Sequence, residues 1–428
     1  MRWLPLLCLL TALVSGLVAV LAPGGVKADP AADVASRACS ALSSRVAAVS
    51  GDGPVFLRSY DAGSGDGPNP EPALNAAFTY DNALAAIALR ACGNLAGAKR
   101  IGDALLQASA ADRSGAAGRL RNAYRPGPVH ETPVPPMGWW NQAEGQWDED
   151  PYQVSSATGN LAWAALALLT LADATHDQEY VDGAGRIAAW AAKASYDERA
   201  PAGFAGGLYG YDDAAQPLGW KSTEHNVDLA AVFDWLARLR PEGGWQAKAK
   251  SARDFVAALW DPKLGRFWVG TLPDGTSINR ANSGLDAELW PLLLTDAPAE
   301  WKAALAYAEH NHGVRPGFDF NDDRDGVWWE GTAQAALVYG AVGNGAKADR
   351  LLKAVGRRFS PGGLLWATDA ARITTGLALS PSSTTDDFYY FRLPHLGATA
   401  WAALAARGWN PFSGAPITGA PIGGKPVP

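Results

Sequence analysis

The sequence repeats one pattern five times: a helix that is apolar on nearly every side precedes a helix with one charged face. Helices that are apolar all round are buried, whereas helices with a single apolar face cover a core. The five pairs are expected at 77–93 with 94–110, 156–174 with 179–195, 223–239 with 245–260, 283–295 with 299–311, and 329–343 with 346–359. This alternation predicts an inner ring of helices enclosed by an outer ring.

Two further helices are expected outside these pairs, at 31–50 and 394–408. The first has the character of an outer helix and the second that of an inner helix, so pairing them gives a sixth hairpin and closes the ring. The prediction is therefore an all-α (α/α)6 toroid over residues 29–411, which can exceed the usual size of a single core because it grows around a ring. A tail at 412–428, rich in Pro and Gly, is expected to be disordered or draped on the surface.

The connectors differ greatly in length, which argues against the alternative of an open α-solenoid built from similar repeats. Residues 111–155 and 196–222 form long connections with many aromatic residues, whereas the links within pairs are short. Segments such as RFWVGTLPDGTSIN at 266–279 are expected to form β-hairpins with PDG as the turn. Long loops on one side of regular hairpins usually carry function.

Residues 1–28 are expected to be a secretory signal peptide, because Arg2 precedes an apolar run and VKA offers small residues for cleavage after Ala28. The predicted location is therefore secreted or periplasmic. The apolar run is about 20 residues long, enough to span a bilayer, so an uncleaved membrane anchor stays open. The formal net charge is −7 and no stretch is densely basic, which argues against nucleic acid as a partner.

Cys39 and Cys92 remain after removal of the signal and are expected to form a disulfide, because ring closure would bring their helices together. The bond would close a loop of about 54 residues and contribute on the order of 4 kcal/mol. No metal and no cofactor are expected, since two distant cysteines and scattered histidines make no zinc site. The acidic loop at 319–326 has Arg324 where a calcium loop requires glycine, so it is interpreted as an acidic loop that contacts substrate hydroxyls.

Acidic and polar residues recur in the first turns of the expected inner helices, whose N-termini should open on one face. A single acid there needs no function, because the helix dipole stabilises it by about 0.3–1 kcal/mol. That explanation can suffice for Asp228 and Asp286. Several acids gathered together repel one another, however, which raises the pKa of one and places an acid beside a base. The residues expected at this face are Asp81, Asn160, Glu224, His225, Asn226, Asp228, Asp286, Glu288, Glu330, Gln334, Asp386, Asp387, Tyr389, Tyr390, Arg392 and His395.

Glu330 is the first choice for a general acid and Glu224 is its close rival. Apolar neighbours and nearby carboxylates are expected to raise the pKa of Glu330, and Gly331 to leave its carboxyl room to approach a substrate. The base should stand across the cavity, with Glu224, Asp81 and the pair Asp386 and Asp387 as candidates.

The chain contains 18 tryptophans, several in the loops that lead to these helix starts. Aromatic rings stack on the apolar faces of sugars, and polar side chains bind their hydroxyls. Trp329, Trp140 and Trp220 are expected to line the cavity with partly exposed rings. The full set of expected substrate-binding residues is Trp329, Trp328, Trp140, Trp220, Tyr80, His225, Asn226, Gln334, Tyr390, Arg392 and His395.

STEHN at 222–226 and GVWWEGTAQ at 326–334, within this arrangement of helices, resemble a secreted bacterial branch of the (α/α)6-toroid glycoside hydrolases, also called six-hairpin glycosidases. The resemblance covers almost the whole chain after residue 28 and implies processing of a sugar polymer. We therefore expect a monomeric, secreted glycoside hydrolase that acts on a polysaccharide or oligosaccharide with a pair of carboxylates. The long loops favour an open cleft and endo action.

Three alternatives stay open. A sugar epimerase on the same toroid would use paired histidines, for which His225 and His395 are available. A polysaccharide lyase would use Tyr389, Tyr390, Arg392 and His395, but the acidic loops suit a uronate polymer poorly. A non-catalytic glycan-binding protein would keep the tryptophans without needing the acids.

Overall fold

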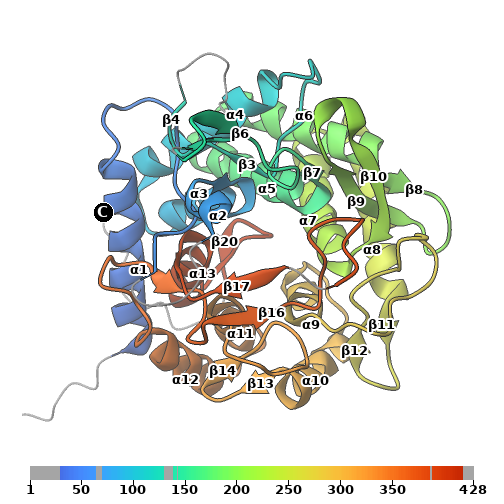
Figure 1. The fold of residues 1–428 in the computed structure, drawn as a ribbon. Helices are drawn as coiled ribbons and strands as arrows, with labels where there is room; N and C mark the ends of the chain where they lie inside the picture. The colour runs from blue at the N-terminus through green and yellow to red at the C-terminus, as the bar shows by residue number, and fades with distance from the viewer. Residues whose placement is uncertain (1–28, 64–69, 130–137, 142, 386–387, 418–428) are drawn as a thin grey trace, which may run out of the picture.

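The computed structural model describes residues 29–63, 70–129, 138–141, 143–385 and 388–417 (Figure 1). Its helices form two concentric rings, which confirms the predicted (α/α)6 toroid. The inner helices are α3 (Thr79–Ala91), α5 (Thr158–Thr175), α7 (Thr223–Leu239), α9 (Leu285–Leu289), α11 (Trp329–Ala341) and α13 (Leu396–Arg407). The outer helices are α4 (Leu95–Ala110), α6 (Gln178–Ser195), α8 (Trp245–Ala258), α10 (Ala304–Asn311), α12 (Gly345–Val355) and α1 (Pro30–Ala47). A short α2 (Glu71–Leu74) lies in a connection.

The two rings bury different parts of their helices, as the sequence pattern predicts. Every residue of α5 from Leu161 to Ala172 is buried. In α12, by contrast, the buried residues are Ala348, Leu351, Leu352 and Val355, which share one face at a spacing of three and four. The links from an inner to an outer helix are short. In two of them a glycine with positive φ, Gly93 or Gly343, is followed by an asparagine that caps the outer helix.

The ring closes at α1, which packs against α13 as predicted (Figure 1). Its first half meets α12, where the Arg37 guanidinium donates to the Gly356 carbonyl. Its second half meets α4, where Arg100 Nη1 donates to the Val46 carbonyl at 2.9 Å. The helix therefore joins both ends of the outer ring across the last inner helix.

A disulfide joins Cys39 of α1 to Cys92 at the end of α3, with the two Cα atoms 5.6 Å apart. The predicted pairing is confirmed. Residues 1–28 lie outside the described residues, and so does the expected signal peptide. No helix in the described part of the chain combines the length and the apolar character needed to cross a membrane.

The fourth hairpin departs from the prediction. Helix α9 ends at Leu289, and the chain continues as the 3-10 turn η3 (Trp290–Leu293) rather than as one helix to residue 295. Pro291 explains the change, because it has no N–H to donate to the preceding turn. Its partner also starts as a 3-10 turn, η4 (Ala299–Ala303), before α10. The remaining 3-10 turns are η1 (Asp212–Ala214) and η2 (Pro241–Gly243).

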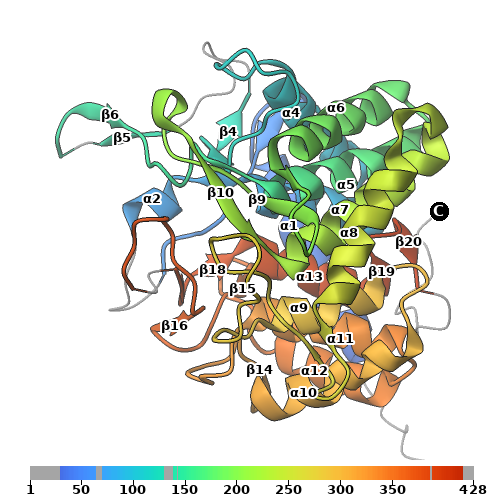
Figure 2. The ribbon, with the colours of Figure 1, turned by 90° about the vertical axis from the view of Figure 1, so that its right-hand side faces the viewer.

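Short antiparallel strands decorate the ring. In Figure 2 the β5–β6 hairpin, β9–β10 and β16 lie on one side of the ring, whereas β19 and β20 lie on the other. The paired strands are β1 (Val55–Phe56) with β4 (Gly127–Pro128), β2 (Ala77–Phe78) with β3 (Ala123–Tyr124), β5 (Trp139–Asn141) with β6 (Gln146–Asp148), β11 (Trp260–Asp261) with β12 (Arg266–Phe267), β13 (Gly313–Val314) with β14 (Gly317–Phe318), β15 (Leu365–Trp366) with β18 (Pro394–His395), β16 (Arg372–Thr374) with β17 (Tyr389–Phe391), and β19 (Trp409–Asn410) with β20 (Ala415–Pro416). A four-stranded sheet contains β7 (Ser156–Ala157), β8 (Tyr196–Asp197), β9 (Gly203–Tyr209) and β10 (Gln216–Lys221).

The hairpin expected at 266–279 is only partly present. Arg266 and Phe267 form β12, which pairs with the preceding strand β11 instead of with residues after the turn. Around the PDG turn, an isolated β-bridge joins Thr271 to Ile278.

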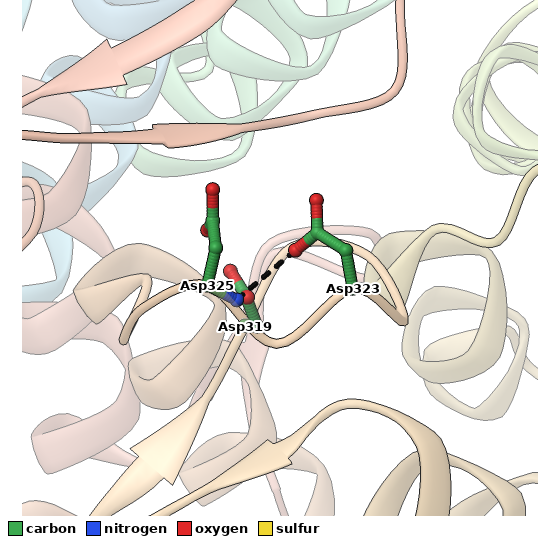
Figure 3. Close-up of side chains that lie close together, drawn as sticks. All are labelled: Asp319, Asp323 and Asp325. Carbon is green, nitrogen blue, oxygen red and sulfur yellow. Dashed lines mark hydrogen bonds between the residues drawn. The ribbon is translucent and has the colours of Figure 1, made fainter.

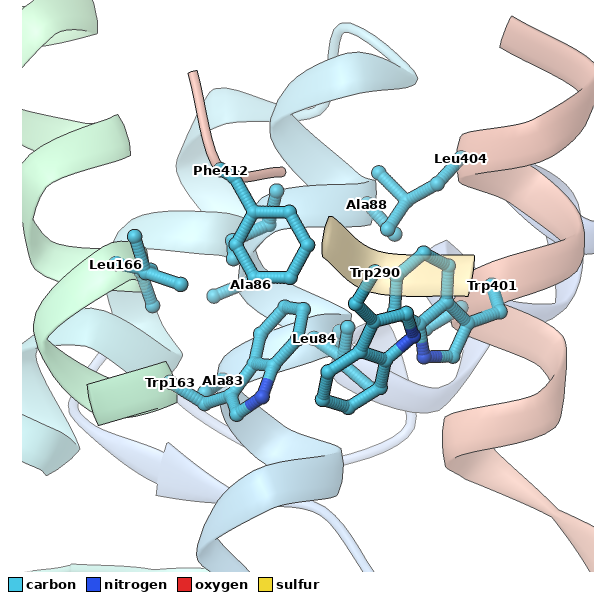
Figure 4. Packing of buried hydrophobic residues seen from close by; sticks show 14 of the residues in the cluster. Ala83, Leu84, Ala86, Ala88, Trp163, Leu166, Trp290, Trp401, Leu404 and Phe412 are labelled. Carbon is cyan, nitrogen blue, oxygen red and sulfur yellow. The ribbon is translucent and has the colours of Figure 1, made fainter. Parts of the chain in front are cut away.

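Aromatic side chains fill the centre of the ring (Figure 4). The Trp163 ring lies 5.4 Å from that of Trp290, 5.6 Å from that of Trp401 and 5.3 Å from that of Phe412. Because Phe412 is buried in this cluster, the packed ring extends past the expected boundary at residue 411. The aromatic cluster closes the axis of the toroid.

Candidate active site

A cavity of about 180 Å³ opens where the inner helices begin. All six inner helices contribute to it through their first turns or the residues just before them, so the predicted convergence of helix starts is present. Strands β2, β7, β10 and β18 lead into four of these helices and fix where the helices start. The cavity is lined by Tyr60, Phe78, Tyr80, Asp81, Tyr152, Gly159, Asn160, Trp163, Glu224, His225, Asp228, Asp286, Trp290, Phe320, Glu330, Leu377, Phe388, Tyr390 and His395.

One wall holds a histidine between two carboxyl groups. His395 Nε2 lies 3.2 Å from Asp81 Oδ1, and His395 Nδ1 lies 3.4 Å from Glu330 Oε2. The Tyr80 hydroxyl donates to Glu330 Oε1 at 2.8 Å, and Trp401 Nε1 donates to the Tyr80 hydroxyl at 2.9 Å. The chain of contacts joins α3, α11 and α13, and the Glu330 carboxyl is contacted from two sides, by Tyr80 on α3 and by His395 at the start of α13.

The pKa values of this wall are shifted in a way that suits proton transfer. Burial raises the pKa of Glu330 to about 7, with a smaller contribution from Asp81, while His395 and Tyr80 oppose the rise. Burial also opposes the charged form of His395, but the carboxylates of Asp81 and Glu330 outweigh it and raise the pKa of the imidazole. Apolar neighbours and nearby carboxylates were both expected to raise the pKa of Glu330, and burial is the larger of the two causes.

The opposite wall is a second carboxyl group cluster, Glu224 and Asp228 on α7 and Asp286 on α9. Desolvation raises the pKa of Glu224 to about 7. Burial, together with the Glu224 carboxyl, raises the pKa of Asp228 well above its usual value. Burial and the carboxyls of Glu224 and Glu330 do the same for Asp286. We call these three residues the carboxyl triad.

Two oxygens of the carboxyl triad lack partners. Among the residues that the structure describes, Oδ1 of Asp228 and Oδ1 of Asp286 are buried without a hydrogen-bond donor in good geometry. The two side chains are almost fully buried, with residue exposures of 1% and 5%. The Trp163 indole and the Gln334 amide lower the pKa values of Asp228 and Asp286 as nearby donors, but neither meets these oxygens in good geometry, so both oxygens can accept a further hydrogen bond from a ligand.

His225 faces the cavity from the first turn of α7. Burial lowers the pKa of His225 to about 4, so the imidazole is neutral at physiological pH. The Trp220 ring lies 5.4 Å from it. A Cβ at Gly159 would lie 2.5 Å from the imidazole, so the ring packs directly against the backbone of α5.

The predicted site residues divide into three groups. Those in the cavity wall are Asp81, Tyr80, Glu224, His225, Glu330, Tyr390 and His395. Those outside the wall are Asn226, Gln334, Trp220, Trp328, Trp329 and Arg392. Asp387 lies outside the described residues, as does the side chain of Trp140.

The expectation of partly exposed rings is wrong for Trp329. It is fully buried, its indole nitrogen donates to Asp369 Oδ1 at 3.1 Å, and the Arg358 guanidinium covers its ring. Trp328 is equally buried and packs against Phe320 and Tyr390, which line the cavity. Both tryptophans therefore pack behind the wall that carries Glu330.

Gly331 has a different role from the one expected. A Cβ at this position would lie 2.2 Å from the Trp328 ring and 2.7 Å from Leu285 Cδ2. The glycine lets α11 pack closely against the Trp328 ring and α9, rather than clearing space for a substrate.

Three predicted substrate-binding residues that lie outside the wall contact other parts of the protein, namely Asn226, Gln334 and Arg392. The Asn226 side chain bonds the backbone of Phe204 on β9, and Gln334 accepts from the indole of Trp290. Arg392 is exposed and lies over the Trp366 ring.

Sequence reasoning missed several wall residues. Asp228 and Asp286 were explained as helix-start charges, yet both line the cavity. Tyr60, whose ring stacks on His395 with centroids 4.3 Å apart, lies in a loop without a periodic pattern. Trp163 and Trp290 sit inside apolar helical runs, where no signal distinguishes a cavity floor from an ordinary core.

The acidic loop lies beside the cavity without lining it through its acids. Asp319, Asp323 and Asp325 bring carboxylate oxygens within 4.8 Å of one another (Figure 3). Asp323 and Asp325 also accept hydrogen bonds from Thr374, which ties this loop to β16. Phe320 is the residue of this loop that reaches the cavity.

Trp220→Ala is expected to weaken several-fold the glycan binding that the sequence predicts, because the Trp220 ring packs beside His225 in the cavity wall. Titration of a bound oligosaccharide by calorimetry would measure the change. Trp147→Ala is the matched control, since Trp147 is a 43%-exposed tryptophan outside the wall. Equal affinity of wild type and Trp220→Ala would remove Trp220 from the substrate-binding set.

No protein-family model and no curated protein matches this chain. Solved structures do match in fold. A glycosidase aligns over 92% of this chain and 100% of its own, with a TM-score of 0.56 and 14% identity. A family 76 α-mannanase from Bacteroides thetaiotaomicron covers 88% of this chain and 98% of its own, with a TM-score of 0.54 and 13% identity. A cellobiose 2-epimerase from Spirochaeta thermophila covers 88% and 96%, with a TM-score of 0.58 and 11% identity.

The chain thus has the six-hairpin glycosidase-like fold. Structural neighbours with this fold include glycoside hydrolases and an epimerase, and one glycosidase variant among them is in complex with glucose. At identities this low, the similarity establishes the fold, and the function has to be argued from the site.

Proposed function

We propose that this protein is a glycoside hydrolase that uses Glu330 as general acid and Glu224 as general base. The observation that carries the proposal is that two glutamates from different inner helices line one cavity, each with its pKa raised to about 7. A pair of carboxyl groups poised near neutral pH is what glycosidic bond cleavage requires.

In this proposal Glu330 gives its proton to the glycosidic oxygen as the bond from the anomeric carbon to that oxygen breaks. Glu224 takes a proton from the water that attacks the same carbon, so the products are two sugars with one water added. The Tyr80 and His395 contacts orient the Glu330 carboxyl for this step. Asp81 is engaged with His395, which makes Glu224 the better base.

The remaining lining residues suit a sugar. Tyr60, Tyr152, Trp163, Trp290 and Phe388 offer aromatic surface, and the carboxyl groups between them accept hydrogen bonds from hydroxyls. The proposed partner is therefore a carbohydrate. The disulfide between Cys39 and Cys92 supports a location in an oxidising compartment outside the cytoplasm.

A sugar epimerase is the second candidate, favoured by one observation. His225 and His395 line the same cavity with opposite pKa shifts, which would supply a neutral base and a protonated acid. An epimerase would remove a proton from a carbon atom and return one to the opposite face.

Turnover in D2O separates the two reactions. A hydrolase is expected to release new reducing ends and to leave every carbon-bound hydrogen of the sugar in place. NMR of the products from a glycan panel would test both points in one measurement. Deuterium at a sugar carbon without new reducing ends would replace the hydrolase proposal by the epimerase.

A further inference from the structure

We infer that the cavity admits one terminal sugar unit that carries no acidic group, and that the carboxyl triad receives its hydrogen-bond donors. This inference rests on the proposed function for its relevance to catalysis, and it names the substrate class that the site selects. It differs from the expectation of endo action in an open cleft.

The volume of the cavity gives room for a single sugar ring. Its volume of about 180 Å³ is close to that of a cavity of about 150 Å³ that holds one benzene molecule in another protein. Trp163 and Trp290 form its floor, and they pack against Trp401 and Phe412 across the axis of the toroid. A glycan cannot pass through this floor, so it can enter only by one end.

Apolar side chains from two loops also line the cavity. Leu377 and Phe388 line the cavity from the segment that joins β16 to β17, and Phe320 lines it from the acidic loop. These apolar side chains enclose a ring that stands in the cavity, which suits removal of an end unit better than binding of a long chain.

Within the part of the chain that the structure describes, the wall offers no free cation to an acidic ligand. Five carboxyl groups line the cavity, those of Asp81, Glu224, Asp228, Asp286 and Glu330. No lysine or arginine lines it within the described residues. His395 is already engaged by Asp81 and Glu330, and His225 is neutral near pH 7 because burial lowers its pKa to about 4. A carboxylate on the ligand would therefore be buried without a cationic partner, which is strongly unfavourable.

The same wall favours a ligand that donates hydrogen bonds. Oδ1 of Asp228 and Oδ1 of Asp286 are buried without a donor in good hydrogen-bond geometry among the described residues, although the Trp163 indole lies near the Asp228 carboxyl and the Gln334 amide lies near the Asp286 carboxyl. A sugar hydroxyl or a sugar ammonium would satisfy both. The bound unit is therefore a neutral sugar or an amino sugar, and binding measurements can distinguish the two.

The test is a binding panel with the full-length wild-type protein at pH 8, using matched sets of a hexose, its 2-amino sugar, its uronate and its uronamide. The glucose, galactose and mannose series provide such sets, and calorimetry or ligand-observed NMR at millimolar concentrations measures the affinities. In at least one series the neutral or amino sugar is expected to bind at least about tenfold more tightly than the uronate.

The uronamide is the control for size, because it has the shape of the uronate without its charge. It is expected to bind like the neutral hexose. A clear preference for the amino sugar would assign an ammonium to the triad, whereas equal binding would assign hydroxyls. The inference is overturned if the uronate binds as tightly as its neutral partner, if uronate and uronamide are rejected equally, or if no sugar in the panel binds.

Variants locate the selection in the triad. Asp228→Asn combined with Asp286→Asn is expected to reduce the preference for the uncharged sugar over the uronate, and Asp254→Asn on the exposed face of α8 is expected to leave it unchanged. If the folded double variant keeps the wild-type preference for the uncharged sugar, Asp228 and Asp286 do not cause that preference. Because no panel sugar contains a scissile bond, these results are independent of whether the protein hydrolyses glycans.

Discussion

Glu330→Gln is expected to reduce kcat on the true substrate by at least about a hundredfold, the lower end of what a general acid contributes. Glutamine keeps the shape of the side chain and can still accept from Tyr80, but it cannot give a proton to the leaving oxygen. Glu224→Gln should cause a loss of similar size, because the attacking water would lose its base. Initial rates of reducing-end release on a responsive glycan would measure both losses.

Glu242→Gln is the matched control for both variants. Glu242 is an exposed glutamate in η2, between α7 and α8, and it is remote from the cavity wall. It should retain the wild-type rate. Full activity of both Glu330→Gln and Glu224→Gln would leave these glutamates as ordinary helix-start charges and would remove the proposed mechanism.

The pH dependence of kcat/KM is a second test of Glu330 as the general acid. Glu330 must be protonated to act as an acid and its pKa is about 7, so kcat/KM should fall as the pH rises above that value. The pKa of Glu330 is about 7 in the folded state and 4.5 in the unfolded state. The stability that this difference contributes is therefore fully present below about pH 4.5 and is lost as the pH rises through about 7. At pH 8, Glu330→Gln should thus melt at the same temperature as the wild type or higher.

Replacing both Cys39 and Cys92 by alanine is expected to lower the free energy of unfolding by about 4 kcal/mol. The bond spans 53 positions of the chain and ties α1 to the end of α3, so its loss frees a long loop in the unfolded state. The midpoint of urea unfolding would measure the change. Reductant should lower the midpoint of the wild type and leave that of the double variant unaltered, and a wild type indifferent to reductant would contradict the prediction.

The architecture was predictable because it depends on periodicity. Apolar runs such as Leu161–Ala172 and one-faced patterns such as that of α12 have few alternatives to an inner and an outer ring. The fourth hairpin was mispredicted, because Pro291 in η3 ends α9 at Leu289 and its partner begins as the 3-10 turn η4. The disulfide followed from ring closure rather than from the spacing of the cysteines.

The site was less predictable because helix starts look alike in sequence. Asp81, Glu224 and Glu330 were found because acids recur in the first turns of the inner helices. Asp228 was set aside because an acid in the first helical turns needs no function, and only its position in the cavity wall distinguishes it. Trp329 shows the converse error, since adjacency to Glu330 in the chain placed it in the site although its ring faces Asp369 and Arg358.

Helix α1 joins the two ends of the outer ring, and this position affects the order in which the chain can fold. Its main inner partner, α13, lies more than 300 positions later in the sequence. Synthesis of the intervening residues on a ribosome takes on the order of half a minute, and during that time α1 lacks this partner. Contacts of such separation are slow to form, and an uncovered apolar face is prone to aggregation. Cys92, in contrast, is synthesised soon after Cys39. Oxidation of this pair can fix α1 against the first hairpin early, so that α13 later meets a partner that is already in place.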